Sequence, residues 1–354
     1  MINKFFKIIL VLLVFCSCAN NSKNEFVGAK HLNIDSFAST YDIKADSLSI
    51  EVIGLQVVAV ADTFLLGFDY LGRNNFINVY STNDYEFLGS LISKGRGPNE
   101  LLTVRYRDQW EKDSLGCHIW IDDDGFSPNS FKLNITKSLE KEETVFESKI
   151  AFIDYPCFTR YFVNDSTFIG FDFLNGPNTQ VLKYNLRSQK TYSQTNLFKR
   201  DFINKEEKRV YAFNTALNEM NKGIAAASYY LDEISIMTND FSKILACKVG
   251  NSPVSATDVF KIERSKRLVK YIGLRVTDDL IFALYVNKLF SEIQNDENTS
   301  GSEIHVFKWT GEAVAKVRVK ENLFSISIDE SNKCIYANTM NEQIYKYDFS
   351  EILK

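Results

Sequence analysis

The sequence predicts an all-β protein: a six-bladed β-propeller with four antiparallel strands per blade and an N-terminal strand that closes the last blade. Three observations predict this fold. A unit of short strands recurs six times, the copies are spaced about 50–57 residues apart, and the composition favours strands. The chain of 354 residues contains 28 Phe and 17 Tyr but only 5 Pro, and aromatic enrichment of this kind is typical of β proteins.

Each copy of the repeat contains a turn with Asp or Asn, a short apolar strand, a polar loop and a strand in which apolar and polar residues alternate. One landmark in each apolar strand marks the six copies: Phe64, His118, Phe168, Ala225, Ile281 and Cys334. We expect the apolar strand to lie near the axis between neighbouring blades, and the alternating strand to have one face closer to solvent. Six copies at this period fill the chain, which is the pattern of propeller blades.

The two ends of the chain are expected to complete one blade together. The last copy ends at Ile344–Phe349 and leaves too few residues for a fourth strand. The N-terminal stretch Ser47–Val52 has no repeat of its own, so we expect it to supply the missing outer strand. This closure protects an edge that an open ring would expose.

Two segments depart from the regular repeat. Ser291–Ser302, in the fifth copy, is polar and predicts a surface loop. Lys199–Glu219 is charged enough to begin a helix, but we expect a loop that leads into the fourth blade.

The N-terminal residues have the three parts of an export signal. Lys4 and Lys7 precede the apolar run Ile8–Phe15, which is too short for the ~20 residues of a membrane-spanning helix. Phe15–Cys18 resembles a bacterial lipobox, and by that resemblance Cys18 is acylated and becomes the new N-terminus. Several acyl chains hold a protein firmly on a membrane. An ordinary cleaved signal with incidental cysteines is the alternative.

The expected organisation is a lipoprotein signal peptide (residues 1–17), a lipidated tether (18–30) and the propeller (31–354). The formal net charge of −4 offers no general attraction to nucleic acid, so none is expected as a partner. The expected location is the cell envelope, with the lipid anchor in the outer membrane. Cys18–Lys23 lacks the acidic run that resembles a surface-export signal, so we expect the protein to face the periplasm.

A short motif at the end of the first copy identifies a family. An apolar strand runs into a Gly-x-Gly-Pro-x-Glu segment formed by Gly95, Arg96, Gly97, Pro98 and Glu100. Together with the lipobox and the repeat period, this segment resembles the TolB-like six-bladed propeller lipoproteins of Bacteroidetes. The resemblance implies the fold and the envelope location, and it gives little about activity.

The same glycines do not form a complete phosphate-binding loop. The segment lacks the third Gly of a dinucleotide motif and the Gly-Lys-Ser/Thr of a P-loop, and no helix follows it. We therefore interpret Gly95–Pro98 as a turn between blades, in which Gly supplies positive φ and Pro fixes its neighbour.

Motifs for metals and catalysis are weak. Asp122–Gly125 looks like half of a calcium loop, but the twelfth position is Leu133 rather than Glu, so a solvated loop is favoured over a cation site. His31, His118 and His305 lie in different units without metal spacing, and we expect neither a metal nor a cofactor. No Gly-x-Ser-x-Gly motif is present, although a triad assembled in space stays open.

Four cysteines lie in the body of the chain, far apart in sequence: Cys117, Cys157, Cys247 and Cys334. The strand-like surroundings of Cys247 and Cys334 favour buried apolar thiols. One disulfide is the alternative, because an exported protein meets an oxidising compartment.

Candidate ligand-binding residues lie in the loops that share one face around the axial channel. Loops from strand four to strand one pair a cation with a tyrosine, and loops from strand two to strand three carry an acid. These residues are Arg105 with Tyr106, Arg160 with Tyr161, Lys270 with Tyr271, and the acids Asp69, Asp122 and Asp172. Arg and Tyr are typical of recognition surfaces and suit an acidic or hydroxyl-rich ligand. The favoured interpretation is nevertheless that these cations and acids pair with one another between blades.

Two functions from different classes follow. The preferred one is a non-catalytic binding or scaffold propeller, held to the membrane by its lipid, for a protein, peptide or glycan partner. The alternative is a propeller hydrolase or lyase with its active site in the axial channel. An enzyme would need an acid or base with a perturbed environment beside a nucleophile or a metal.

Overall fold

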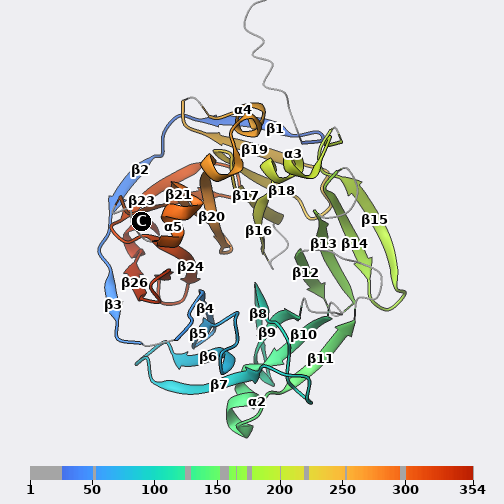
Figure 1. Ribbon diagram of the computed structural model, residues 1–354, viewed down its shortest axis with the longest axis vertical. Coiled ribbons are helices and arrows are strands. Elements are labelled where there is room, and N and C mark those ends of the chain that lie inside the picture. The colour runs from blue at the N-terminus through green and yellow to red at the C-terminus, as the bar shows by residue number, and fades with distance from the viewer. Residues whose placement is uncertain are drawn as a thin grey trace, which may run out of the picture.

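The repeats fold as predicted, into six sheets arranged around one axis (Figure 1). This computed structural model describes residues 26–50, 53–123, 129–151, 159–164, 166–173, 178–199, 201–218, 223–251, 253–295 and 300–353. The expected signal peptide and Cys18 lie outside these residues, as do Cys157 and Asp124–Gly125. Of the helices within the described ranges, none is long and apolar enough to cross a membrane.

Within each repeat, the strands follow one another in chain order from the axis to the rim. Blade one contains β4 (Val57–Ala61), β5 (Phe64–Phe68), β6 (Asn75–Ser81) and β7 (Phe87–Ser93). Blade two contains β8 (Arg105–Asp113), β9 (Gly116–Asp123), β10 (Asn129–Asn134) and β11 (Phe146–Ala151). Blade three contains β12 (Thr159–Asn164), β13 (Thr167–Asp172), β14 (Gln180–Asn185) and β15 (Lys190–Asn196).

The remaining blades take additional strands from the N-terminal segment. Blade four contains β16 (Phe213–Asn218), β17 (Gly223–Ser228), β18 (Glu233–Met237) and β19 (Ile244–Val249). Blade five contains β20 (Leu268–Val276), β21 (Leu280–Leu289), β22 (Ser302–Lys308) and β23 (Ala313–Val319). Blade six contains β24 (Leu323–Asp329), β25 (Cys334–Thr339) and β26 (Ile344–Asp348).

The apolar strand of each repeat is the second strand of its blade, so its expected place beside the axis is wrong. The landmark residues lie on β5, β9, β13, β17, β21 and β25. All residues of β17 and β25 are buried, whereas the axial strand β8 has buried, half-buried and exposed residues. A second strand is paired on both edges and covered on both faces by neighbouring blades, so it is more apolar than a strand bordering the channel.

Polar side chains satisfy the backbone of the axial strands. Gln109 on β8 accepts a hydrogen bond from the Phe162 amide of β12 at 2.9 Å and donates to the Phe162 carbonyl. Ser327 on β24 accepts from the Val60 amide of β4 at 2.8 Å. Axial strands have no further strand to pair with at the channel, so these side chains take the place of a ladder between blades.

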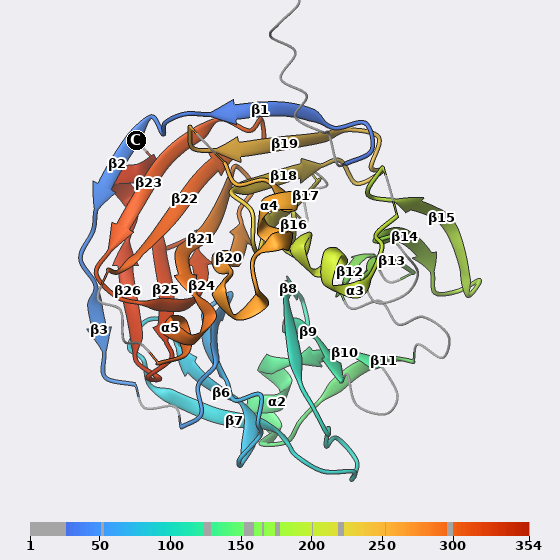
Figure 2. The same ribbon diagram turned by 45° about the horizontal axis from the view of Figure 1, so that its top comes forward.

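The N-terminal segment runs around the rim as a belt of three strands, β1 (Lys30–Ile34), β2 (Ser39–Asp42) and β3 (Asp46–Leu48) (Figures 1 and 2). β1 pairs in parallel with β19 of blade four, and β2 pairs in parallel with β23 of blade five. β3 pairs antiparallel with β26 and completes blade six. The predicted closure is confirmed, while the two parallel belt strands are a further finding.

Short helices lie in the connections: α2 (Ile135–Lys141), α3 (Lys205–Val210), α4 (Ala256–Lys261), α5 (Phe290–Asn295), and the 3₁₀ turns η1 (Arg264–Lys266) and η2 (Ser350–Leu353). The loop expected over Lys199–Glu219 is wrong because it contains α3. Asn204 caps this helix by accepting from the Glu207 amide at 2.9 Å, and the Glu207 carboxylate accepts from the Ile203 amide at 2.7 Å. This reciprocal pattern is close to a capping box. The expected surface loop at Ser291–Ser302 likewise begins within α5.

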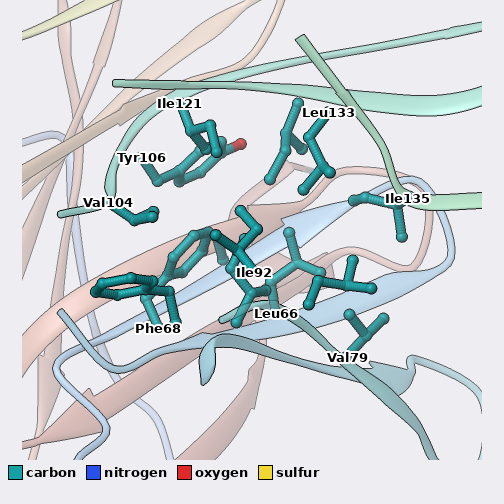
Figure 3. Packing of buried hydrophobic residues seen from close by; sticks show 14 of the residues in the cluster. Leu66, Phe68, Val79, Ile92, Val104, Tyr106, Ile121, Leu133 and Ile135 are labelled. Atoms are coloured by element: carbon teal, nitrogen blue, oxygen red, sulfur yellow. The ribbon is translucent and has the colours of Figure 1, made fainter. Parts of the chain in front are cut away.

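The core lies between adjacent blades rather than inside any one of them. Figure 3 shows Leu66, Val79 and Ile92 of blade one facing Ile121 and Leu133 of blade two. Each of these side chains is buried. A single blade cannot cover both faces of its own sheet, so stability depends on the neighbouring blade.

Candidate functional site

The Gly-x-Gly-Pro-x-Glu motif forms the turn between β7 and β8, and its glutamate closes that turn. Glu100 Oε2 accepts a hydrogen bond from the Gly97 amide at 2.7 Å. A Cβ atom at Gly95 would overlap the Glu100 carboxylate. Positive φ occurs at Asn99 (63°) rather than at either glycine, so the expected conformational role of the glycines is wrong. They instead leave room for the carboxylate that holds the turn.

The three predicted tyrosines are packed inside the protein. Tyr106 stacks on Phe68 with 5.1 Å between ring centroids. The Tyr161 hydroxyl donates to the Thr215 carbonyl of blade four. The buried Tyr271 hydroxyl lies 3.0 Å from His305 Nδ1, and burial raises the pKa values of the Tyr161 and Tyr271 phenols. All three phenol rings therefore contact other parts of the propeller.

The cation Arg160 and the acid Asp122 form an ion pair between blades two and three. Arg160 Nη2 lies 3.1 Å from Asp122 Oδ2, and Arg107 Nε lies 2.7 Å from the same oxygen. The side chains of Arg160 and Asp122 are only 1% and 2% exposed. Asp122 is thus no part of a solvated loop, and that expectation is wrong for this residue. A buried carboxylate needs such partners because its desolvation is costly.

The other predicted cations and acids make separate contacts. Lys270 Nζ lies 3.2 Å from Asp232 of blade four and donates to Asn287 at 2.8 Å. Asp69 accepts from two amides of the turn after β5. Arg105 starts β8 opposite Asp122 in the register, and Asp172 ends β13 opposite Gln180. Of the nine predicted positions, Arg160 and Asp122 form an ion pair, and ligand binding by the set stays a prediction.

An axial polar cluster, formed by Tyr70, Arg107, Asp108 and Arg275, was not anticipated. A bulge in β8 gives Asp108 a φ of 56°, and Asp108 Oδ2 lies 2.9 Å from Arg275 Nη1 of blade five. Burial raises the pKa of Asp108, while Arg275 and Arg107 act in the opposite direction. Burial, followed by the charge of Asp108, raises the pKa of Tyr70 to about 12. The only hint in the sequence is a charged run, Arg105–Asp108, within a strand.

Two of the three histidines belong to buried polar networks. His118 Nε2 lies 2.8 Å from Glu147, and His305 bridges Tyr271 and Glu303. Within the residues that the structure describes, no group of three His, Cys, Asp or Glu side chains could hold a metal ion. Cys117, Cys247 and Cys334 are buried free thiols, as the strand-like surroundings of the last two predict.

At least two cavities lie on the described surface. One, of about 550 Å³, lies beside blade one and includes Asp69 and Tyr80. The larger one, of about 710 Å³, is called the blade-four cavity below. Its volume is in the range of ligand pockets.

The blade-four cavity lies on one face of blade four, where short side chains leave space. Strand register places His31, Ala246 and Ser235 in one row across the sheet, and Ser235 lies opposite Ala226. The next row on this face contains Asn33, Lys248 and Glu233. Aromatic side chains close one end of the cavity: Phe26, Phe198, Tyr211 and Phe213.

A helical connection borders the blade-four cavity. α4, in the connection from blade four to blade five, contacts α3, in the connection from blade three to blade four (Figures 1 and 2). Ser255, Ala256 and Thr257 at the start of α4 line the cavity. Sequence reasoning missed this cavity because it combines the belt, two blades and two loops. The small residues of Gly223–Ser228 are its one visible trace in the sequence.

Comparisons with known proteins agree with the architecture. The TolB-like 6-blade propeller-like family matches residues 56–331, and no curated protein matches the chain. A crystal structure of a DUF4221 family member from Bacteroides vulgatus has a TM-score of 0.53 at 12% identity, covering 89% of this chain and 94% of that one. The β-propeller domain of Myceliophteria thermophila Cps50 (Swd1) has a TM-score of 0.49 at 9% identity, covering 86% and 98%. The structural similarity to the Bacteroides protein shows the fold alone.

Proposed function

Because this chain belongs to the TolB-like 6-blade propeller-like family, we propose that it is a lipid-anchored binding propeller of the cell envelope. The observation that carries this function is the blade-four cavity of about 710 Å³. Eight of its 21 lining residues lie on paired strands, which hold binding groups more rigidly than loops do. A glycan or a peptide segment of a partner is the occupant that such a cavity accommodates.

The proposed anchor lies close to this cavity. Seven residues lie between Cys18 and Phe26, so the tether spans at most about 28 Å when fully extended. Phe26 lines the cavity and packs on Phe198, with 4.8 Å between ring centroids. Acylation of Cys18 would therefore keep the cavity near the membrane surface. A periplasmic orientation at the outer membrane completes the proposal.

The hydrolase or lyase alternative is supported by one residue, Asp108. Its raised pKa and its place in the axial polar cluster meet the requirement for a perturbed acid. However, Asp108 already contacts Arg275 at 2.9 Å, and the neighbouring phenol of Tyr70 has a raised pKa, which makes it a poor nucleophile. Binding is therefore the better-supported function.

Ligand retention by the full mature protein tests the proposal. The wild type and Ser235→Phe are purified from envelopes, and retained glycans or peptides are detected by native mass spectrometry. Ser235 lies on the cavity floor, so a phenyl ring there fills the space. Ser242→Phe is the matched control, because Ser242 is exposed in the turn between β18 and β19.

We expect the wild type and Ser242→Phe to retain the same molecule and Ser235→Phe to lose it, with similar thermal unfolding for all three proteins. Identical retention by the three proteins, or no retained molecule in any, would contradict the proposed binding role of the cavity. A retained product whose formation requires Asp108 would favour the hydrolase or lyase.

A further inference from the structure

We infer that the blade-four cavity binds a hydroxylated organic acid, such as a sugar acid, with its carboxylate between Lys248 and His31. This inference rests on the proposed binding function and specifies the chemistry of the ligand. The cavity supplies two distinct kinds of groups, a cation near an unpartnered imidazole and a set of neutral amides and hydroxyls. Each kind corresponds to one part of the ligand.

Lys248 is a cation of the cavity, and Glu233 lies opposite it in the strand register. Lys248 lies on β19 and lines the cavity, and its side chain has no ion pair or hydrogen bond with any residue in the described ranges. Lys270, by contrast, is paired with Asp232. An ammonium group in a concave, partly desolvated site attracts a ligand carboxylate more strongly than one on an open surface.

His31 lies near Lys248, and both of its ring nitrogens can still form a hydrogen bond. Both ring nitrogens are shielded from solvent and make no hydrogen bond to a described residue. Burial, followed by the positive charges of Lys248 and Lys199, lowers the pKa of His31, so the ring is neutral near pH 7 and one nitrogen carries a proton. A shielded imidazole without partners is costly, and a ring rotation toward a bound carboxylate would satisfy it.

Charges on the surrounding elements favour an anion at this point. Lys248 comes from β19 and Lys199 follows β15, whereas the lining acids are Asp35, after β1, and Asp232 and Glu233 of blade four. Asp232 is paired with Lys270, and Glu233 lies opposite Lys248 in the strand register. None of these three acids is among the causes of the His31 shift, so the charges that act on His31 are those of Lys248 and Lys199.

The rest of the cavity is suited to hydroxyl groups. Asn33, Ser228, Ser235 and Asn251 line it, and amides and hydroxyls can both donate and accept hydrogen bonds. A ligand hydroxyl also does both, so it can match these side chains in several orientations. The aromatic end, with Phe213 and Tyr211, can contact the apolar face of a sugar ring.

Calorimetric titration of the full mature protein tests this ligand class. The probes are glucuronate, galacturonate and gluconate as acids, with glucose as the neutral match and glucosamine as the cationic match. The variants are Lys248→Met, which keeps the aliphatic stem, and Lys243→Met as the control. Lys243 is exposed just before β19 and does not line the cavity.

The second readout is the titration of His31 by NMR. The chain contains three histidines, and the His31 signal is assigned by its absence in His31→Phe. A carboxylate bound beside the ring stabilises the protonated imidazole, so the pKa of His31 should rise when the ligand binds. A merely structural role of His31 would leave this pKa unchanged.

We expect at least one acid to bind more tightly than glucose and glucosamine, with affinity about tenfold or more weaker in Lys248→Met and unchanged in Lys243→Met. The ligand class is overturned if none of the three acids binds, if glucose binds equally well, or if the two lysine variants behave alike. In those cases a molecule retained by the wild type and lost in Ser235→Phe would still support the proposed binding function. If, in addition, no molecule is retained by the wild type and lost in Ser235→Phe, the proposed binding function is contradicted as well.

Discussion

Glu303 and His305 on β22 illustrate how a partly buried carboxylate is stabilised in this protein. Glu303 accepts from His305 Nε2 at 3.1 Å and lies 3.1 Å from Lys316 Nζ. The hydrogen bond from His305, followed by the contacts with Lys316, lowers the pKa of Glu303 from its ordinary value of 4.5 to about 2, although burial opposes this shift. The carboxylate is therefore ionised in the folded protein at pH values where it would be protonated in the unfolded chain.

We expect Glu303→Gln to lower the free energy of unfolding at pH 7 by about 1–3 kcal/mol. A lowered folded-state pKa contributes stability above the unfolded value of 4.5 and loses it as the pH falls toward about 2. The difference between variant and wild type should therefore shrink across that interval. Urea unfolding at several pH values measures it.

The control for this substitution is Glu312→Gln, because Glu312 is exposed and pairs with Lys308 near the same strand. An exposed pair contributes little, so this variant should stay within about 0.5 kcal/mol of the wild type at every pH. A Glu303→Gln penalty that did not change with pH would indicate a packing effect rather than the charge.

At the scale of elements, the belt differs along its length in how firmly it is packed. β3 completes blade six, and its Leu48 is buried against Ile344, Tyr336 and other residues of one hydrophobic cluster. β1 lies on the edge of blade four, and its Leu32 is 36% exposed. The same N-terminal segment thus supplies a structural strand at one end and a wall of the blade-four cavity at the other.

We expect Leu48→Ala to destabilise the protein by about 2–4 kcal/mol, because it leaves a cavity where the first and last strands meet. Leu32→Ala is the matched control and should cost less than about 1 kcal/mol. Denaturant unfolding gives both values, and hydrogen exchange should show lost protection at β26 only in Leu48→Ala. Equal costs for the two leucines would refute a special role of β3 in closure.

At the scale of the whole molecule, the ring and the proposed lipid anchor are linked through the belt. The belt begins beside blade three, where Val27 donates to the Leu197 carbonyl at 3.0 Å, and continues to blade six. A tether at Cys18 would consequently hold the propeller by its rim near the junction of blades three and four. The axial channel would remain distant from the attachment point.

We expect Cys18→Ala to release the protein from the membrane fraction without changing its fold, because several acyl chains provide the attachment. Fractionation with mass spectrometry of the mature N-terminus measures this, and circular dichroism checks the fold. The control is Cys117→Ala, a buried thiol within blade two, which should stay in the membrane fraction. A mature chain that starts at a residue other than Cys18, or that starts at Cys18 without acyl groups, would contradict lipidation.

The sequence by itself determined the number of blades, the closure by β3 and the family, because these depend on local patterns repeated along the chain. The apolar strands around Phe168 and Ile281 each sit between turn residues at the same spacing. The helix α3 could also have been predicted, since Asn204 and Glu207 have the spacing of a capping box. Its charged composition alone was insufficient to choose between helix and loop.

Only the tertiary structure decided which polar residues meet. Arg160 and Asp122 come from different blades, as do Arg275 and Asp108, and a strand pattern gives the direction of a side chain but not its partner across the ring. His31 and Lys248 are separated by most of the chain, and the parallel pairing of β1 with β19 places them on one face. Such contacts form only when the blades and the belt pack together. No local sequence pattern specifies which strands pair or how far apart their side chains lie.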